Sequence, residues 1–291
     1  MPSLSLVLSQ LFNGLTAGLL LALISAGLTI IYGTLGVVNF AHGALLVVGA
    51  YAGYATYGAT DSFVVAVAAG AACALVVGLI MERGLVRLFY RRPPEDQILV
   101  TFGVAIILVE LIRGIFGGVN LSVDTPAWGQ GIVHLGSLIY PLYRFETLFI
   151  SAGTLFVLYL LLYRTRLGLV VRAGIEDSLM VSILGVNIKR VFFGVFGLGA
   201  MVAGYAGMID APIVTLQPDM GFRILIDSFV VVVIGGIGSF PGAILGGIIA
   251  GEILSLTSII DPSYSEVMLF VAMALILIFR PQGIMGLEGR E

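Results

Sequence analysis

Charged residues are scarce in this sequence. Asp, Glu, Lys and Arg make up only 11% of its 291 residues, whereas 59% are hydrophobic. Soluble domains carry about 25% charged residues, so this chain has too few polar residues to cover a surface that faces water. The composition therefore predicts an all-α, polytopic integral membrane protein. It also excludes nucleic acid as a partner, because no basic face is available.

Cysteine, lysine and histidine are almost missing. The single cysteine, Cys73, lies in an apolar stretch, which excludes a disulfide framework or a cysteine metal site. The only lysine is Lys189, and no G-x-x-x-x-G-K-[ST] loop occurs, so we expect the chain to bind no ATP. The two histidines, His42 and His134, form no His-Glu cluster and no Ser/His/Asp spacing. We therefore expect no catalytic residue, metal site or cofactor in this chain.

Long apolar stretches recur from one end of the chain to the other. A helix needs about 20 apolar residues to cross ~30 Å of hydrocarbon. The N-terminus, MPSLSLVLSQ, lacks the basic region of a cleavable signal peptide, so the first stretch is expected to be a span. We predict nine spans in one transmembrane domain, 1–291, with eight or ten possible if a neighbouring pair is one broken helix. They lie near residues 9–33, 38–59, 62–82, 97–117, 145–163, 191–211, 223–238, 241–258 and 266–280.

Basic residues indicate how the spans are oriented. Most of the 14 Lys and Arg residues lie in three segments, which the predicted spans separate by even numbers of crossings. All three can face the cytoplasm, with the N-terminus outward and the chain in the inner (plasma) membrane. They hold Arg83, Arg87, Arg91 and Arg92; Arg164, Arg166, Arg172, Lys189 and Arg190; and Arg280 and Arg290. In the longest outer loop, 118–144, we interpret Trp128, Tyr140 and Tyr143 as interfacial anchors.

A polar, glycine-rich segment at 33–43 interrupts an otherwise apolar stretch. Its distinctive residues are Gly33, Gly36, Asn39, Phe40, His42 and Gly43. Polar groups and broken backbone at membrane depth are tolerated only where they are buried in protein or line a wet cavity. Broken helices are also a recurring way to build solute sites in transporters. Two interpretations stay open: Asn39 and His42 line a solute path, or they cap two helices and bond to neighbouring backbone.

A similar pattern recurs at 235–243. When the two segments are aligned, Gly33 and Gly36 fall on Gly235 and Gly238, and Asn39-Phe40 falls on Ser239-Phe240 after a two-residue gap. Internal repeats are common in transporters, and corresponding breaks point to the site, although glycine-rich sequence also aligns by chance. Our candidates for the solute path are Asn39, Phe40, His42, Thr101, Ser239 and Phe240. Our candidates for breaking and packing helices are Gly33, Gly36, Gly43, Gly235, Gly238 and Gly242.

Charged residues inside the spans need partners. Glu110 and Arg113 are three residues apart, so they share a helix face and are predicted to form an ion pair. Asp210, Asp227 and Glu252 lack an obvious local partner. An intramembrane carboxylate without a partner suggests proton or cation coupling, but Asp210 and Asp227 lie near outer span ends. Glu252 is therefore the best candidate for a functional or inter-helix carboxylate.

The loop at 164–190 is the most distinctive part facing the cytoplasm. Residues 172–184 suit a short helix, because Ile175, Leu179, Ile183 and Leu184 recur at helical spacing. Gly185 is a candidate C-cap. Such an amphipathic helix could lie on the bilayer or dock into a cytoplasmic partner, and acidic residues among basic ones favour a protein partner. The candidate coupling residues are Arg172, Glu176, Asp177, Leu179, Gly185 and Asn187; the segment 83–96 is the second choice.

Four stretches, in order along the chain, carry a family resemblance. The run GLTIIYGTLGVVNFAHGALLVVGAY resembles the signature of LivH-type permeases of ABC importers for branched-chain amino acids. The loop RAGIEDSLMVSILGVNIKRV resembles the motif with which that family engages its ATPase, and VVVVIGGIGSFPGAILGG and FRPQGIMG resemble its closing motifs. Glu176 and Ser182 depart from the pattern, because they stand where small or apolar residues are expected.

The resemblance implies an ABC importer permease fold and a set of partners. It implies a heterodimer with a LivM-type permease subunit, two cytoplasmic ATPase subunits that use ATP and Mg²⁺, and an extracytoplasmic solute-binding protein. It implies branched-chain or other hydrophobic amino acids as solutes, although related importers take urea, amides or aromatic carboxylates. The alternative from another class is an ion-coupled secondary transporter. A channel or intramembrane enzyme would need a selectivity ring or a nucleophile–base pair, and the sequence shows neither.

Overall fold

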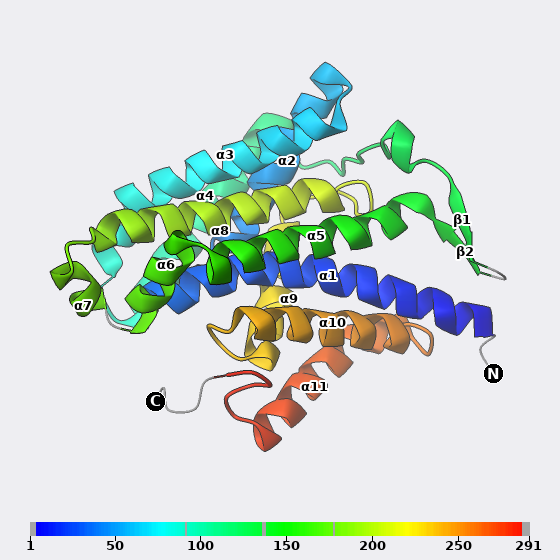
Figure 1. Cartoon of the computed structure of the whole chain (residues 1–291). Coiled ribbons are helices and arrows are strands. Elements are labelled where there is room, and N and C mark those ends of the chain that lie inside the picture. Colours follow the sequence, from blue (N-terminus) through cyan, green and yellow to red (C-terminus); the bar gives the residue numbers. More distant parts are fainter. Residues whose placement is uncertain (1–3, 91, 136–137, 177, 287–291) are drawn as a thin grey trace. The chain divides into compact units, whose positions relative to one another are not determined.

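The computed structural model describes residues 4–90, 92–135, 138–176 and 178–286, and its regular structure is almost entirely helical (Figure 1). Each of the nine predicted spans coincides with one helix, so the predicted all-α fold is confirmed. These helices are α1 (Leu4–Leu35), α2 (His42–Thr60), α3 (Phe63–Gly84), α4 (Pro94–Phe116), α5 (Leu142–Arg164), α8 (Ile188–Asp210), α9 (Met220–Gly235), α10 (Phe240–Thr257) and α11 (Ser265–Phe279). Arg91, Asp177 and Arg290 lie outside the described residues.

Within the described ranges, seven of these helices are long and apolar enough to cross a membrane. The two that fall short are α2 and α9. Helix α9 has only 16 residues, which corresponds to about 24 Å, less than the ~30 Å of a hydrocarbon core. Helix α2 has 19 residues, and its last turns are rich in Tyr, Gly and Thr. Each of these two helices borders one glycine-rich break: α2 follows the first break, and α9 precedes the second.

The chain divides into two compact units, and each combines segments that are distant in sequence. The first unit comprises residues 1–26, 124–155 and 226–291, and the second comprises residues 27–123 and 156–225. Three of the boundaries fall inside helices, in α1, α5 and α9, and neither unit is a continuous stretch of chain. The single-domain assignment for 1–291 stays a prediction.

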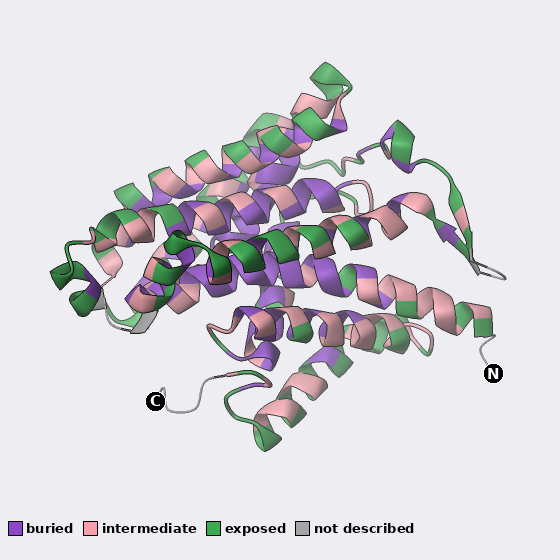
Figure 2. Ribbon diagram, viewed as in Figure 1, coloured by how far each residue is buried: buried purple, intermediate pink, exposed green. Residues whose placement is uncertain are grey.

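Close helix packing through small residues builds the second unit. Helix α3 buries one stripe of its surface at helical spacing, made up of Phe63, Ala66, Gly70, Ala74, Gly78 and Met81. Its other face exposes large apolar side chains, such as Val64 and Ile80, as a helix that faces lipid would. In Figure 2, exposed residues recur along the length of α3. Where α2 and α8 approach each other, a Cβ on Gly49 would lie 2.6 Å from the carbonyl oxygen of Gly204 and would overlap its backbone. No side chain fits at that contact.

The first unit has its own apolar core. Val230, Val231 and Ile234 of α9 pack with Ala250 of α10 and Leu269 of α11. The segment after α11 returns to the end of α9, where the Ile284 and Met285 amides donate to the carbonyls of Ile234 and Gly235, both at 2.9 Å. The closing motif FRPQGIMG is therefore bonded directly to the glycine-rich break.

A short antiparallel hairpin lies in the predicted outer loop. Strands β1 (Ile132–Leu135) and β2 (Leu138–Pro141) pair with His134 opposite Ile139, after a single 3₁₀ turn, η2 (Ala127–Gly129). The interpretation of Tyr140 and Tyr143 as interfacial anchors is wrong, because both are buried. Tyr140 packs against Phe12 and donates a hydrogen bond to Asn13 Oδ1 at 3.0 Å. Burial raises the pKa of the Tyr140 hydroxyl.

The segment between α5 and α8 forms two helices instead of the predicted single helix at 172–184. Helix α6 (Arg166–Glu176) begins six residues earlier than predicted, and α7 (Ser178–Ile183) follows it. The early start has a local cause: the Thr165 hydroxyl accepts the Gly168 amide at 3.2 Å and thereby caps the first turn of α6. Asp177 lies outside the described residues, and so does the side chain of Glu176.

Candidate translocation and coupling sites

The first helix break is a short linker between α1 and α2. Helix α1 ends at Leu35, and Gly36 then takes a left-handed conformation (φ +67°). Asn39 Oδ1 accepts a hydrogen bond from the Ala41 amide at 3.1 Å, and His42 is the first residue of α2. Both Asn39 and His42 are fully buried. The oxygen of Asn39 thus bonds to neighbouring backbone, as one of the two interpretations predicted, but the N-cap position of α2 is Ala41, and that helix has no side-chain cap.

The nitrogen of Asn39 has a different environment. In the described part of the chain, Nδ2 is buried and has no hydrogen-bond partner. A buried donor that stays unpaired is costly, and the bond that the oxygen makes to the Ala41 amide does not involve this nitrogen. The solute-path interpretation of Asn39 stays a prediction, and the two interpretations involve opposite ends of one side chain.

Thr101 of α4 lies directly against the first break. Its hydroxyl accepts a hydrogen bond from the Phe40 amide at 3.1 Å and donates to the Gln97 carbonyl at 2.8 Å. The structure therefore brings three of the path candidates together: Asn39, Phe40 and Thr101. His42 packs against α1, since a Cβ on Gly27 would lie 3.0 Å from its Cε1.

The second break lies in the first unit and has a similar backbone. Helix α9 ends at Gly235, and Gly238 takes a left-handed conformation (φ +82°), as the aligned Gly36 does. Ser239 then caps α10, its hydroxyl accepting the Gly242 amide at 3.1 Å, and Phe240 is buried. Ser239 is the N-cap of α10, whereas the aligned Asn39 bonds to the amide of Ala41, the residue before α2. The duplication stays a prediction.

The charged residues inside spans have partners in most cases. The predicted pair of Glu110 and Arg113 is confirmed, and Arg113 also donates two hydrogen bonds to Asp219, at 2.7 and 2.8 Å. Asp210 and Asp227 each have an interaction partner as well. Glu252 differs: its Oε2 is buried without a hydrogen-bond partner among the described residues and would lie 2.7 Å from a Cβ on Gly14. It is an inter-helix carboxylate, packed against α1.

Helix α7 and the residue after it carry large apolar side chains that no other part of the described chain covers. Leu179 and Ile183 are each 71% exposed and Leu184 is 76% exposed, whereas Val181 is buried. These residues lie in the segment between the helices α5 and α8. Exposed apolar clusters mark sites that contact a protein or a membrane, and docking of α7 on a protein partner stays a prediction.

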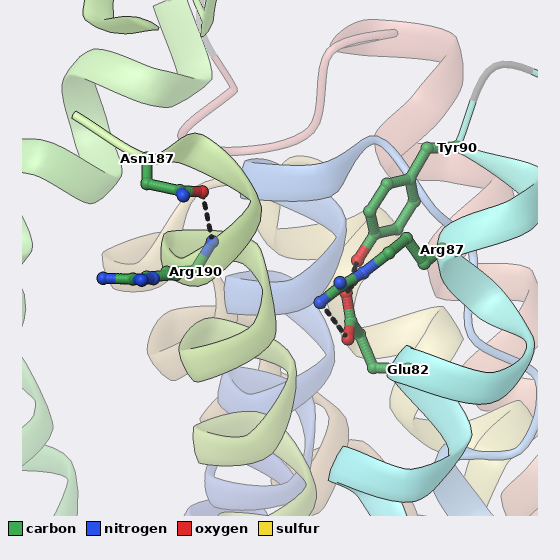
Figure 3. A network of polar contacts seen from close by, with 5 residues as sticks. All are labelled: Glu82, Arg87, Tyr90, Asn187 and Arg190. Atoms are coloured by element: carbon green, nitrogen blue, oxygen red, sulfur yellow. Dashed lines mark hydrogen bonds and ion pairs between the residues drawn. The ribbon is translucent and has the colours of Figure 1, made fainter. Parts of the chain in front are cut away.

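The end of α7 and the start of α8 are both capped. Gly185 is left-handed (φ +84°), its amide donates to the Ser182 carbonyl at 3.0 Å, and the Val186 amide donates to the Val181 carbonyl at 3.3 Å. This is the Schellman arrangement, so the predicted C-cap at Gly185 is confirmed. Asn187 caps α8 by accepting the Arg190 amide at 3.3 Å (Figure 3). Only one residue separates the two caps, so α7 leads almost directly into α8.

Arg172 was a candidate coupling residue, but its side chain contacts another helix of the same chain. Its guanidinium lies 5.0 Å above the ring of Tyr163, in the last turn of α5. This stacking fixes α6 to the end of α5. Arg172 therefore contacts the end of α5 within the chain, and its role in coupling stays a prediction.

A buried charged cluster at the end of α3 was missed. Glu82 is fully buried, and it accepts two hydrogen bonds from Arg87, at 3.1 and 2.9 Å, and one from the Tyr90 hydroxyl at 2.6 Å (Figure 3). The hydrogen bond to Glu82 raises the pKa of Arg87, and burial together with the same carboxylate raises the pKa of Tyr90. One sequence signal could have revealed this cluster. Glu82 lies two residues before the end of α3, and a carboxylate that is buried there needs a partner nearby.

The geometry describes a multi-pass membrane protein with two broken helices and a capped, apolar segment between spans. The family described as branched-chain amino acid transport system / permease component matches residues 10–279. The chain belongs to this family, whose members are permease subunits of ABC importers.

Several curated relatives align over nearly the whole chain. The high-affinity branched-chain amino acid transport system permease protein LivH of Escherichia coli K12 is 31% identical, over 96% of this chain and 95% of its own length. The corresponding protein BraD of Pseudomonas aeruginosa is 31% identical over 98% of each chain. The probable LivH of Methanocaldococcus jannaschii is 28% identical over 94% of this chain and 90% of its own length. No solved structure matches the chain significantly.

Proposed function

We propose that this chain lines the solute path of an importer in the inner (plasma) membrane and carries branched-chain or other hydrophobic amino acids. The relatives named as branched-chain amino acid permeases, aligned from end to end, carry the proposal. The partners are a LivM-type permease subunit, two cytoplasmic ATPases that bind ATP and Mg²⁺, and an extracytoplasmic solute-binding protein. The chain itself binds no cofactor and hydrolyses nothing. Urea, amides and aromatic carboxylates are the alternative solutes.

The test is reconstitution in liposomes, with and without the partner subunits. The complete complex is expected to take up leucine only when ATP is supplied on the side of the membrane that carries the ATPase subunits and the binding protein is present on the other side. The chain alone is expected to show neither ATP hydrolysis nor uptake under a proton or sodium gradient. Gradient-driven uptake by the chain alone would instead identify an ion-coupled secondary transporter. A binding screen on the partner binding protein then decides among the solutes.

Asn39 provides a test of the solute path at the first break. Asn39→Ala removes both the oxygen that accepts the Ala41 amide and the buried nitrogen, and is expected to abolish most uptake. Asn39→Ser retains an oxygen that can accept a backbone amide two residues on but removes the nitrogen. If the nitrogen serves the path, both variants assemble with the ATPases and both lose uptake. Restored uptake in Asn39→Ser would show that Asn39 acts only through its bond to the backbone. His42→Ala is expected to lower uptake without affecting assembly.

Gly185 provides a test of the joint between α7 and α8. A Cβ at this position meets no atom within 4 Å, so a substitution there acts only through the left-handed backbone. Valine in that conformation costs roughly 1–2 kcal/mol or more, whereas asparagine adopts it readily. Gly185→Val is therefore expected to lower solute-stimulated ATP hydrolysis, and Gly185→Asn to retain it. Equal activity of the two variants would contradict a role for this cap in coupling.

A further inference from the structure

The Glu82 cluster, which consists of Glu82, Arg87 and Tyr90, holds the connection between α3 and α4 in one conformation. Arg87 lies in the 3₁₀ helix η1 (Val86–Phe89), and Tyr90 follows it directly. All three hydrogen bonds converge on one fully buried carboxylate. A buried ion pair adds little to stability compared with apolar residues of similar size, and its main effect is to fix the arrangement of the residues that form it. Here that arrangement involves elements on both sides of the cluster.

On one side the Glu82 cluster contacts the start of α8. The rings of Tyr90 and Phe192 meet edge to face, with centroids 5.5 Å apart and an interplanar angle of 89°. The Arg87 guanidinium lies 5.9 Å from the ring centroid of Phe193. Phe192 and Phe193 lie in the first two turns of α8, just after the Asn187 cap. A displacement of α7 that moves the start of α8 therefore reaches Tyr90 and Arg87 first.

On the other side, the same connection is bonded to α4. The Gln97 side chain is buried, and its Nε2 donates to the carbonyls of Phe89 at 3.1 Å and of Arg92 at 3.0 Å. One turn further along α4, Thr101 bonds to the Gln97 carbonyl and accepts the Phe40 amide. Gln97 thus joins the η1 segment to the helix turn that holds the first break.

Apolar packing follows the same course. Val37 and Ala41 of the break share one core cluster with Val86 of η1 and Phe196 of α8, and Tyr90 packs against this cluster. All of these residues belong to the second unit. Hydrogen bonds and packing therefore connect the start of α8 to the break at 36–41 without a gap.

We propose that Tyr90, Arg87, Glu82 and Gln97 are positioning residues that transmit a displacement of the start of α8 to the break at 36–41. The inference rests on the proposed function, because it assumes that ATPases act on the 164–190 segment. The alternative is that the cluster only stabilises the loop. A residue that only stabilises changes the amount of folded protein but leaves the solute carried per ATP unchanged, and this separates the two roles.

The experiment compares Tyr90→Phe and Gln97→Leu with a matched control in the reconstituted complex. Arg83→Gln removes an arginine from the last turn of α3, next to Glu82 in sequence, but Arg83 is exposed and is not a member of the Glu82 cluster. Both test variants are expected to assemble with the ATPases and to carry about 2- to 30-fold less leucine per ATP hydrolysed, the range expected for mutations that modulate coupling. The double variant is expected to lose no more than the stronger single variant, because both act along one series of contacts. Arg83→Gln is expected to match the wild type.

A second readout needs no transport activity. Amide hydrogen exchange at 36–41 is measured on the purified chain, and Tyr90→Phe is expected to increase it while Arg83→Gln does not. Wild-type leucine per ATP in both test variants would overturn the inference, even if exchange increased, because the cluster would then be a stabiliser only. Additive losses in the double variant would also overturn it. A wild-type complex without ATP-dependent uptake would overturn the proposed function itself, and this inference with it.

Discussion

Leu179→Asp is expected to abolish stable association with the ATPase subunits while the chain still inserts into the membrane. Leu179 is 71% exposed on α7, beside Met180, Ile183 and Leu184, which are also exposed. Burying a leucine side chain contributes about 1.5–3 kcal/mol, and an aspartate at the same place would bury an unpaired charge. The summed loss corresponds to about 100-fold weaker binding or more, since 1.4 kcal/mol is a factor of ten. Co-purification of the ATPases with the tagged chain measures it.

Leu88→Asp is the matched control for Leu179→Asp. Leu88 lies in η1, within the second-choice coupling segment 83–96, and is 69% exposed. It should retain wild-type co-purification if α7 is the docking element. The opposite pattern, with loss in Leu88→Asp and retention in Leu179→Asp, would move the docking surface from α7 to η1.

Gly49→Ala is expected to prevent the accumulation of folded protein. The added methyl group would overlap the backbone of Gly204 across the contact between α2 and α8. Neither backbone can move without separating the two helices at this contact, so the cost is expected at or above the upper end of the ~1–3 kcal/mol typical of overpacking. The measurements are the yield of monodisperse protein in detergent and its melting temperature.

The same helix offers a control for Gly49→Ala. A Cβ on Gly58 in α2 meets no atom within 4 Å. Gly58→Ala is therefore expected to be neutral or stabilising by up to about 1 kcal/mol, because alanine loses less backbone entropy than glycine in a helix. A wild-type melting temperature for both variants would show that α2 and α8 do not approach as closely as described.

The helices of the fold were predictable because hydrophobic length is a local property. Every predicted span coincides with a helix, and Gly185 was predictable as a cap because a glycine after a periodic apolar segment is a local signal as well. The helix at 172–184 was not predicted correctly, since the signal that starts α6, the Thr165 cap, lies before the periodic stretch. A cap seven residues before the predicted start of the helix leaves the periodicity unchanged.

The site was predictable only in part, because its polar contacts join residues far apart in sequence. Thr101 was a candidate, but its bond to the Phe40 amide joins positions 61 residues apart. Tyr140 was assigned to the membrane interface from its residue type, whereas its hydroxyl bonds to Asn13, 127 residues away. The members of the Glu82 cluster are at most eight positions apart in sequence. The cluster was still missed, because its link to α8 depends on the ring of Phe192, which is distant in sequence.

The return of the chain end to α9 decides where an affinity tag can be attached. The amides of Ile284 and Met285 bond to the last carbonyls of α9, and a Cβ on Gly283 would lie 2.5 Å from the Gly236 amide nitrogen. A tag or fluorescent protein fused directly after α11 would replace these residues and leave two helix-end carbonyls without donors. Fusions therefore have to begin after residue 286, and a C-terminal deletion series should show its sharpest loss of folded protein between 286 and 283.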